Sequence, residues 1–388
     1  MAGVFPFKGE VYNPKKVDIA SVVTPPYDVI GEEEQNEYYK KSPYNIIRLI
    51  LGKEHNRYEM AKETLALWRR NNIFIEEKEE YFYLYEQEWE IFGERGKFQG
   101  IIASLILEDY TSGIILPHER ILKKPKVDRL KLLKACNTNF SPIFLIFSDN
   151  GKIKALIKPI HPPFIEFEYK NGLFCRLWRI EKNKDIQKAF QKIRLFIADG
   201  HHRYDTALTY FKETKDEKKK RTMALISSIE YGDFKILPAH RIIKGMPDIL
   251  RIKRYFNIEE KPKEKILPCL SERKEIGVFG VCTRNFSFII TLKDKGLLNK
   301  IKEELRMLDV SILHVLLFDG KINESEIEYT IDRNLVFDRA MNGACGFFLR
   351  PTDISDVLKI ASSGNRMPGK ATYFYPKPFC GLVIHPLV

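Results

Sequence analysis

Residues 195–208 read LFIADGHHRYDTAL, in which a polar cluster follows an apolar run. Five consecutive residues, Asp199 to Arg203, comprise an acid, a glycine, two histidines and an arginine. The apolar run is typical of a buried strand, and the segment after the cluster is typical of a helix. The first amides of a helix lack partners within the helix and carry partial positive charge. The pattern therefore predicts an anion site at a strand-to-helix turn.

Each residue of this turn has a predicted role. Gly200 allows the main chain to approach a ligand, and His201 and His202 add donors. The planar guanidinium of Arg203 suits two phosphate oxygens and is expected to contribute more to a phosphate site than to stability. The carboxylate of Asp199 would repel a phosphate unless a cation joined them, which indicates Mg²⁺ with Asp199 as a metal ligand.

Two other interpretations of this turn stay open. Asp199 could cap the following helix through its carboxylate, which is a purely structural role. Alternatively, His202 and Asp205 lie three residues apart and could ligate the metal of a hydrolase. The sequence contains no further cluster rich in histidine or aspartate that would complete such a metal site.

The composition is that of a globular chain. Hydrophobic residues make up 44% and charged residues 30% of 388 residues, so the chain can bury a large interior. Sixty-four basic against 52 acidic residues give a net charge of +12, which favours anionic partners of any kind. The six cysteines show no CxxC spacing, and no apolar run is long enough to span a bilayer. We expect a cytoplasmic protein with reduced thiols and no membrane partner.

Periodicity and turn residues predict mixed helices and strands. Residues 57–70 and 184–193 are expected to form helices, and residues 45–51 a strand. A hairpin is predicted within residues 79–110, a second at Asn171-Gly172, and a third at the DNG sequence that ends at Gly151. His240 and Arg241 are placed at the end of a strand.

The chain resembles a broad prokaryotic family catalogued as domain of unknown function 1015. The resemblance rests on five blocks along nearly the whole chain: TPPYDVI (24–30), HER (118–120), IADGHHRYDTAL (197–208), LPAHRII (237–243) and MPGKATYFYPKPFCGLVI (367–384). Where the family is expected to have MPQKST, this chain has MPGKAT. A hydroxyl at position 371 is therefore replaced by Ala371.

The order of these blocks is also similar to that of free-serine kinases built on the ParB/sulfiredoxin-like fold. This resemblance implies an α+β protein with a ParB/sulfiredoxin-like core at 101–250, flanked by α/β regions at 1–100 and 251–388. It implies a phosphate site at Asp199 to Arg203 and a base, Glu119, for the serine hydroxyl. Some members of the family use pyrophosphate, so the resemblance implies pyrophosphate as the phosphate donor, with ADP or ATP as alternatives.

Further residues complete the predicted site. Lys370 and Arg241 are expected to contact phosphate, and Asp28, His118 and His240 to bind the substrate. Sequences for a P-loop, a dinucleotide fold or a protein kinase are missing. The sequence thus favours a serine kinase with Mg²⁺, L-serine and pyrophosphate or a nucleotide as small-molecule ligands. A ParB-like nucleic-acid-binding regulator is disfavoured by interspersed charges, and a non-catalytic phosphate sensor stays a further alternative.

Overall fold

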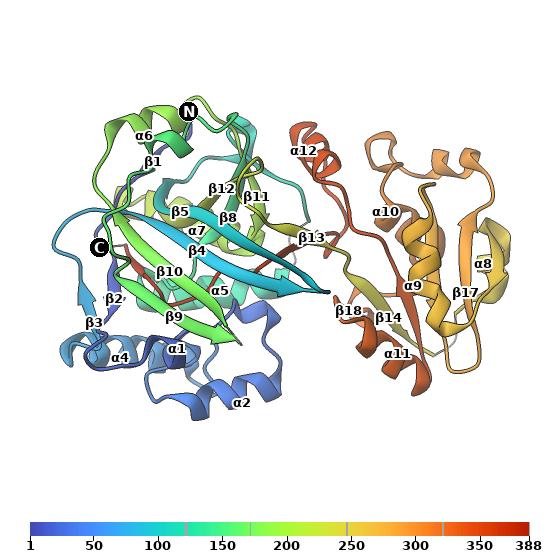
Figure 1. Cartoon of the computed structure of the whole chain (residues 1–388), viewed down its shortest axis with the longest axis horizontal. Coiled ribbons are helices and arrows are strands. Elements are labelled where there is room, and N and C mark those ends of the chain that lie inside the picture. Colours follow the sequence, from blue (N-terminus) through green and yellow to red (C-terminus); the bar gives the residue numbers. More distant parts are fainter. Residues whose placement is uncertain (121–122, 171, 246, 320–321, 388) are drawn as a thin grey trace. The chain divides into compact units, whose positions relative to one another are not determined.

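The computed structural model describes residues 1–120, 123–170, 172–245, 247–319 and 322–387. Helices and strands are mixed along the chain, which confirms the α+β class (Figure 1). The residues pack as two units. The first unit comprises Met1–Pro117, Ile121–Phe234 and Pro376–Val388, and the second comprises His118–Arg120 and Lys235–Tyr375. This division differs from the three consecutive regions predicted, because strands from residues 82–106 and 173–228 share one sheet.

The first unit contains a nine-stranded mixed sheet in the order β6-β11-β8-β12-β5-β4-β10-β9, with β1 paired to β5. Its strands are β1 (Val4–Phe5), β4 (Phe82–Ile91), β5 (Glu94–Ile106), β6 (Ile115–Pro117), β8 (Ile143–Phe147), β9 (Ile165–Lys170), β10 (Leu173–Ile180), β11 (Leu195–Asp199) and β12 (Arg221–Ser228). Two-stranded pairs join β2 (Glu10–Tyr12) to β3 (Phe74–Glu76) and β7 (Thr138–Asn139) to β21 (His385–Pro386).

The helices of the first unit are α1 (Ile19–Val22), α2 (Glu32–Lys41), α3 (Ile47–Ile50), α4 (Arg57–Arg70), α5 (Lys123–Cys136), α6 (Lys184–Phe190) and α7 (His201–Thr214). Helix α4 matches its prediction, and it buries Ala61, Leu65 and Trp68, which recur along one face. Within the described residues, no helix combines the length and apolar character needed to cross a membrane.

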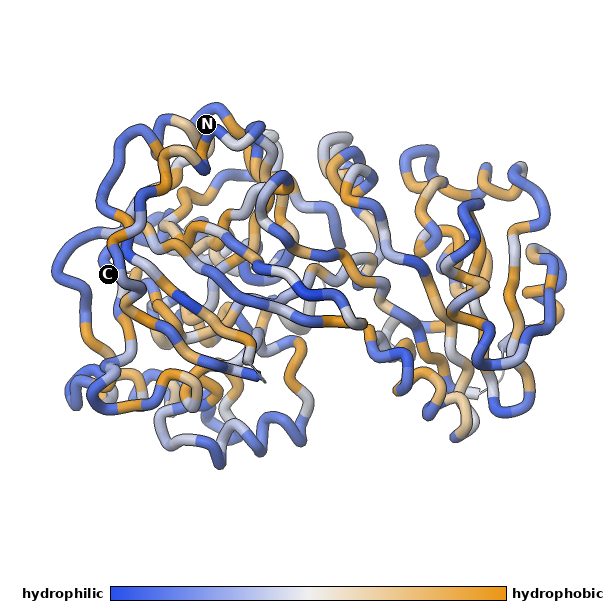
Figure 2. Tube along the Cα trace, in the orientation of Figure 1, coloured by the Kyte–Doolittle hydropathy of each residue, from blue (hydrophilic) through white to orange (hydrophobic). Residues whose placement is uncertain are grey.

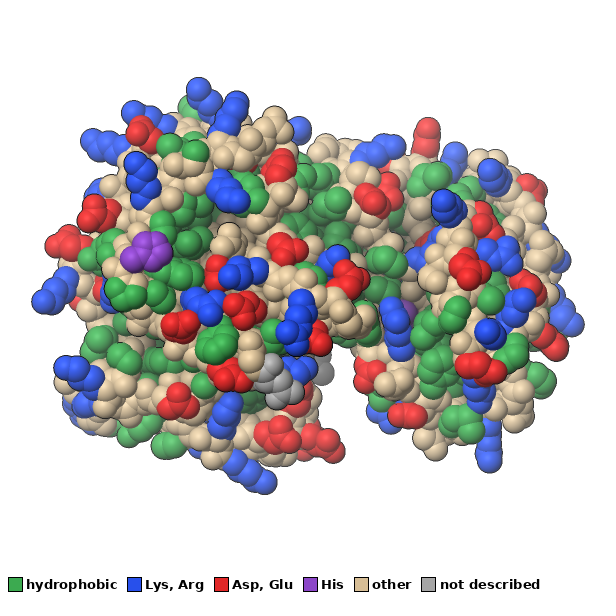
Figure 3. Space-filling view, in the orientation of Figure 1, with side chains coloured by type: hydrophobic (Ala, Val, Ile, Leu, Met, Phe, Trp, Pro, Cys, Tyr) green, Lys and Arg blue, Asp and Glu red, His purple; other side chains and the backbone are tan. Residues whose placement is uncertain are grey.

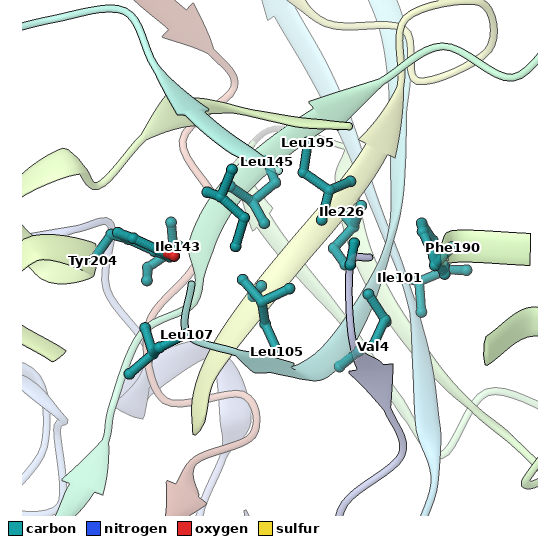
Figure 4. Close-up of a cluster of buried hydrophobic side chains, with 14 of the residues drawn as sticks. Val4, Ile101, Leu105, Leu107, Ile143, Leu145, Phe190, Leu195, Tyr204 and Ile226 are labelled. Atoms are coloured by element: carbon teal, nitrogen blue, oxygen red, sulfur yellow. The ribbon is translucent and has the colours of Figure 1, made fainter. Parts of the chain in front are cut away.

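The core of the first unit lies around the central strands β8, β11 and β12, whose apolar residues are buried almost without interruption. Figure 2 shows this concentration of hydrophobic residues along the strands. Ile143, Leu145, Leu195 and Ile226 of the sheet pack with Tyr204 of α7 in one buried cluster (Figure 4). Burial of such side chains anchors the start of α7 on the sheet.

The local predictions had mixed outcomes. The hairpin of β4 and β5 and that of β9 and β10 are confirmed, although Asn171 itself lies outside the described residues. The strand predicted at 45–51 is wrong, because the chain there forms α3, with the Asn45 side chain accepting from the Ile47 amide. The hairpin predicted at Gly151 is also wrong. Strand β8 pairs with both β11 and β12, but neither pair is joined by a tight turn.

The second unit contains an antiparallel sheet in the order β15-β17-β16-β19-β14-β18. The strands are β13 (Lys235–Leu237), β14 (His240–Lys244), β15 (Phe256–Glu260), β16 (Val278–Cys282), β17 (Ser287–Leu292), β18 (Glu328–Thr330), β19 (Ala344–Phe348) and β20 (Tyr373–Tyr375), of which β13 and β20 pair separately. The helices are α8 (Ile249–Tyr255), α9 (Lys263–Glu272), α10 (Asp309–Leu313), α11 (Arg333–Met341) and α12 (Ile354–Ser362). His240 and Arg241 begin β14, whereas the sequence placed them at a strand end.

Candidate phosphate site

The predicted polar turn is a single residue long. Strand β11 ends at Asp199 and α7 begins at His201, so only Gly200 lies between them. Gly200 has φ +87°, a left-handed conformation that side chains rarely adopt. His201, His202 and Arg203 therefore form the first turn of a 14-residue helix. The structure brings all five predicted residues together at the end of a buried strand.

The carboxylate of Asp199 lies between two cations. Its Oδ2 accepts from Nη2 of Arg203 at 2.6 Å, and its Oδ1 pairs with Nζ of Lys377. The side chains of Asp199 and Arg203 are each 12% exposed, and that of Lys377 is 10% exposed. Charged hydrogen bonds with little exposure to water are stronger than those on the surface. The two cations thus neutralise an acid that would otherwise repel an anion.

Arg203 is a structural residue as well as a candidate ligand. Its Nη1 donates to the carbonyl of Pro142 and, at 3.2 Å, to the hydroxyl of Ser141. Burial acts to lower its pKa, but the charges of Asp199 and Asp28 outweigh burial and raise the pKa. The guanidinium is therefore charged at any working pH. The expectation that Arg203 contributes little to the fold is revised.

One edge of the Arg203 guanidinium lies beside Gly200. A Cβ built on Gly200 would be 3.0 Å from both Nε and Nη2 of Arg203. Among the described residues, none accepts a hydrogen bond from Nε. Glycine is thus required at this position for its φ angle and for the room it leaves. The guanidinium thus lies directly against the glycine that opens α7.

Asp28, which the sequence predicts to bind the substrate, also has charged neighbours. Asp28 lies close enough to Arg203 to influence its pKa. The neighbouring Tyr27 faces the guanidinium of Arg129, with 3.9 Å from Cζ to the ring centroid. Burial raises the pKa of Tyr27 to about 12, so that it stays neutral. A cavity of about 60 Å³ lies beside these groups, and its lining includes Tyr27, Arg129, Ser141, Arg203 and Thr206.

The predicted residues His118, Glu119 and Lys370 belong to the second unit. The HER segment runs beside the loop at Met367, whose amide donates to the His118 carbonyl at 2.8 Å. The Glu119 Oε1 accepts from the main-chain amide of Lys370 at 2.9 Å. His118 is buried, and its Nε2 is 2.9 Å from the Thr372 hydroxyl. These contacts form one connected cluster within that unit.

Arg241 and His240 are buried, with 1% exposure each. Arg241 donates through Nη1 to the Ala239 carbonyl and through Nη2 to the Lys370 carbonyl, at 2.9 Å for the latter. His240 Nδ1 accepts from the Leu349 amide, and burial lowers its pKa to about 3. The phosphate contact of Arg241 and the substrate contacts of His240 and His118 stay predictions, and within the unit Arg241 and His240 also hold main-chain groups.

The residues present do not assemble a resident Mg²⁺ site. Both oxygens of Asp199 are engaged by cations, and within the described ranges no three His, Cys, Asp or Glu side chains group as metal ligands. The hydrolase alternative is also disfavoured, since Asp205 pairs with Lys126 at 2.6 Å. Asp199 as a ligand of a metal brought by the phosphate donor stays a prediction.

Lys377 was missed in the sequence. It lies 178 residues from Asp199, between two prolines in the sequence YPKPF. Proline fixes φ and limits the main chain on both sides of the lysine. This rigid setting was the signal that could have singled out Lys377. Its partner, Asp199, could not be predicted from the local sequence.

Comparisons with known proteins place these observations in a wider setting. The model of the family described as protein of unknown function (DUF1015) matches residues 4–311. No curated protein matches the chain. Among solved structures, a variant free serine kinase in complex with ADP has a TM-score of 0.39 at 17% identity, covering 67% of this chain and 84% of that one. SbnI with a C-terminal truncation, from Staphylococcus aureus, has a TM-score of 0.42 at 12% identity, covering 71% and 84%. A conserved hypothetical protein from Pyrococcus furiosus has a TM-score of 0.38 at 16% identity, covering 71% and 92%.

Proposed function

We propose that this chain, which belongs to the DUF1015 family, transfers a phosphoryl group from a diphosphate-containing donor to the hydroxyl of free L-serine. Pyrophosphate is the favoured donor, and ADP and ATP are the alternatives. The products are O-phosphoserine and inorganic phosphate when pyrophosphate is the donor. The proposal rests on the turn at Gly200 and on the sequence resemblance to free-serine kinases.

The observation that carries the proposal is the environment of Arg203. A buried guanidinium, fixed by Pro142, Ser141 and Asp199, directs its Nε–Nη2 edge to the glycine that opens α7. A fixed donor fork at a helix N-terminus combines two recognised means of binding phosphate oxygens. Because the groups are already held in place, little reorganisation is needed when charge develops on the transferred group.

The remaining roles follow from chemistry. Gly200, His201 and His202 supply main-chain and imidazole donors to the donor's phosphates, and Lys377 adds a positive charge through its pairing with Asp199. Lys370 contributes a further cation. Asp28 is assigned to the ammonium of the amino acid, since carboxylates pair with amines. Glu119 is assigned as the base for the hydroxyl.

The reaction balances without an oxidant or reductant. The serine Oγ forms a bond to the transferred phosphorus as the bond to the leaving phosphate oxygen breaks. The hydroxyl proton passes to the Glu119 carboxylate. The cationic groups of the turn stabilise the negative charge on the oxygens of the transferred group. Mg²⁺ accompanies the phosphate donor as its counter-ion, and no step depends on a metal held by the protein.

The activity is tested by incubating the protein with L-serine, Mg²⁺ and one donor at a time, and measuring O-phosphoserine by mass spectrometry. We expect product with pyrophosphate and a loss of at least a hundredfold in rate for Arg203→Lys. That change keeps the charge but removes the fork. The matched control is Lys212→Met at the other end of α7, which removes a lysine that pairs with Asp109 on the surface.

The absence of O-phosphoserine with all three donors would reject the proposal. Stabilisation by pyrophosphate without turnover would then indicate a phosphate sensor. Binding of duplex DNA that weakens steeply with salt would indicate a regulator. On the face drawn in Figure 3, basic and acidic side chains are interspersed, which is unlike a surface for nucleic acid.

A further inference from the structure

Lys370 has an unusual main-chain conformation for a residue with a side chain. Its φ is +55°, in the left-handed region. Such a conformation is unfavourable for a residue with a Cβ, and other contacts must offset its cost. The residue that precedes Lys370 is Gly369, which could have taken the same conformation at little cost. The loop therefore specifies a left-handed conformation at the lysine itself.

Two charged side chains hold the main chain of Lys370. Its N–H donates to Glu119 Oε1, and its carbonyl accepts from Arg241 Nη2, each at 2.9 Å. Hydrogen bonds of this kind, with an ionised partner, are about twice as strong as neutral ones. Glu119 and Arg241, which are far apart in the sequence, thus hold both main-chain polar groups of Lys370 by hydrogen bonds.

Arg241 is well suited to a fixed position. It lies on β14 between β18 and β19, with its Cζ 5.3 Å from the centroid of the Tyr329 ring. Its second donor nitrogen, Nη1, is bonded to the Ala239 carbonyl. Burial lowers its pKa to about 10, and the charges of Tyr329 and Glu119 oppose that change, so it stays protonated near neutral pH. The hydrogen bonds to these two carbonyls fix the orientation of the guanidinium.

We propose that Arg241 is a positioning residue, which holds the Lys370 main chain against Glu119 and so sets the directions of the Lys370 ammonium and the Glu119 carboxylate. This inference rests on the proposed function for its consequence in catalysis. It replaces the role of direct phosphate contact expected from the sequence. The HER segment and the loop at Met367 are also joined by the hydrogen bond from the Met367 amide to the His118 carbonyl.

The inference is tested first without reference to activity. Hydrogen exchange of the Lys370 amide is measured by NMR in the full chain, in Arg241→Met and in Arg241→Lys. We expect exchange at least tenfold faster in Arg241→Met, with the fold retained as judged by amides of β16. The matched control is Lys244→Met, at the exposed end of the same strand. Unchanged exchange in both Arg241 variants overturns the inference.

A double-mutant cycle then separates positioning from direct contact. In the wild type, Arg241→Met is expected to lower kcat about a hundredfold, as expected for misplaced catalytic groups. In the Lys370→Gly background the same change should cost less than in the wild type, because one of the two groups that Arg241 positions, the ammonium, is already gone. Equal losses in the two backgrounds, together with a raised KM for pyrophosphate, would show direct phosphate contact instead. If wild type forms no O-phosphoserine, the exchange measurement alone decides the inference and the proposed function fails separately.

Discussion

The main-chain amide of Lys370 donates a hydrogen bond to Oε1 of Glu119, 251 residues earlier in the chain. Glu119 therefore has a structural role in its own unit, whatever chemistry it performs. A variant that tests Glu119 as a base must keep this hydrogen bond while it removes the negative charge.

Glutamine meets that condition, because its Oε1 accepts in the same way. We expect Glu119→Gln to lower the rate of O-phosphoserine formation by about a hundredfold to ten-thousandfold, the usual contribution of a base. Binding of pyrophosphate, measured by calorimetry, should change less than threefold. Glu328→Gln, which alters an exposed ion pair with Arg339, is the control. A normal rate in Glu119→Gln would remove the base assignment and leave the phosphate turn untouched.

Gly200→Ala separates main-chain strain from contact with Arg203. Gly113 also has a positive φ, of +67°, but a Cβ there would meet nothing within 4 Å. We expect Gly113→Ala to lower the free energy of unfolding by about 1 kcal/mol and to leave the activity unchanged. Gly200→Ala should lose more, and turnover with it, because the new methyl displaces the Arg203 guanidinium. Equal behaviour of the two variants in denaturation and rate measurements would contradict this account.

Arg203→Ala is expected to destabilise the first unit as well as abolish activity. The change leaves the Pro142 carbonyl without its guanidinium donor and Asp199 with Lys377 as its cation. Removing one partner of a buried charged pair costs about 3 kcal/mol. Urea denaturation of the variant, compared with wild type, measures the loss. A variant that keeps full stability would show that the three contacts of Arg203 contribute little.

Lys377→Met tests the residue that the sequence did not reveal. Asp199 would lose one of its two cations while Arg203 stays in place. We expect weaker pyrophosphate binding by tenfold or more, since an acid only partly neutralised repels the anion. Lys182→Met removes a lysine from a much more exposed pair, with Glu80, and should change neither binding nor stability measurably. Unaltered affinity in Lys377→Met would exclude the lysine from the site.

Three buried histidines make the stability depend on pH. Burial lowers the pKa of His240 and His314 to about 3 and that of His385 to about 4, against 6.5 when unfolded. Between these values the unfolded chain binds more protons than the folded one, so stability falls as pH drops below 6.5. At pH 5 each histidine costs about 2 kcal/mol relative to pH 7. Denaturation at pH 7, 6 and 5 measures the slope, which His240→Gln should reduce. A flat profile would contradict the lowered pKa values.

Local sequence was sufficient where a fold element depends on its own residues. Helix α4 and the hairpins at Phe92-Gly93 and Gly172 follow from spacing and turn residues within a few positions. Strand β8 shows the limit of such reasoning. Its apolar residues predict a strand, but its parallel partner β12 begins at Arg221, so the register depends on tertiary packing. Residues Ile47–Ile50 form a short, mostly buried helix because their surroundings outweigh the β-branched composition of this segment.

The same distinction holds for the site. Asp199 to Arg203 were identified because they are adjacent and follow a buried strand. The burial of Arg241 and His240 could not be predicted, because a polar side chain is buried when distant carbonyls and amides satisfy it. Ala239, Leu349 and Lys370 provide those partners, and two of the three lie more than 100 residues away.

Residues 376–388 return to the first unit, where β21 pairs with β7 and Leu387 accepts from Lys219 Nζ. During translation the chain emerges from its N-terminus, and most domains fold in that order. Here the ribosome synthesises the whole of the second unit before Lys377 exists. The pairing of Asp199 with Lys377 can thus form only after residues 235–375 have been synthesised.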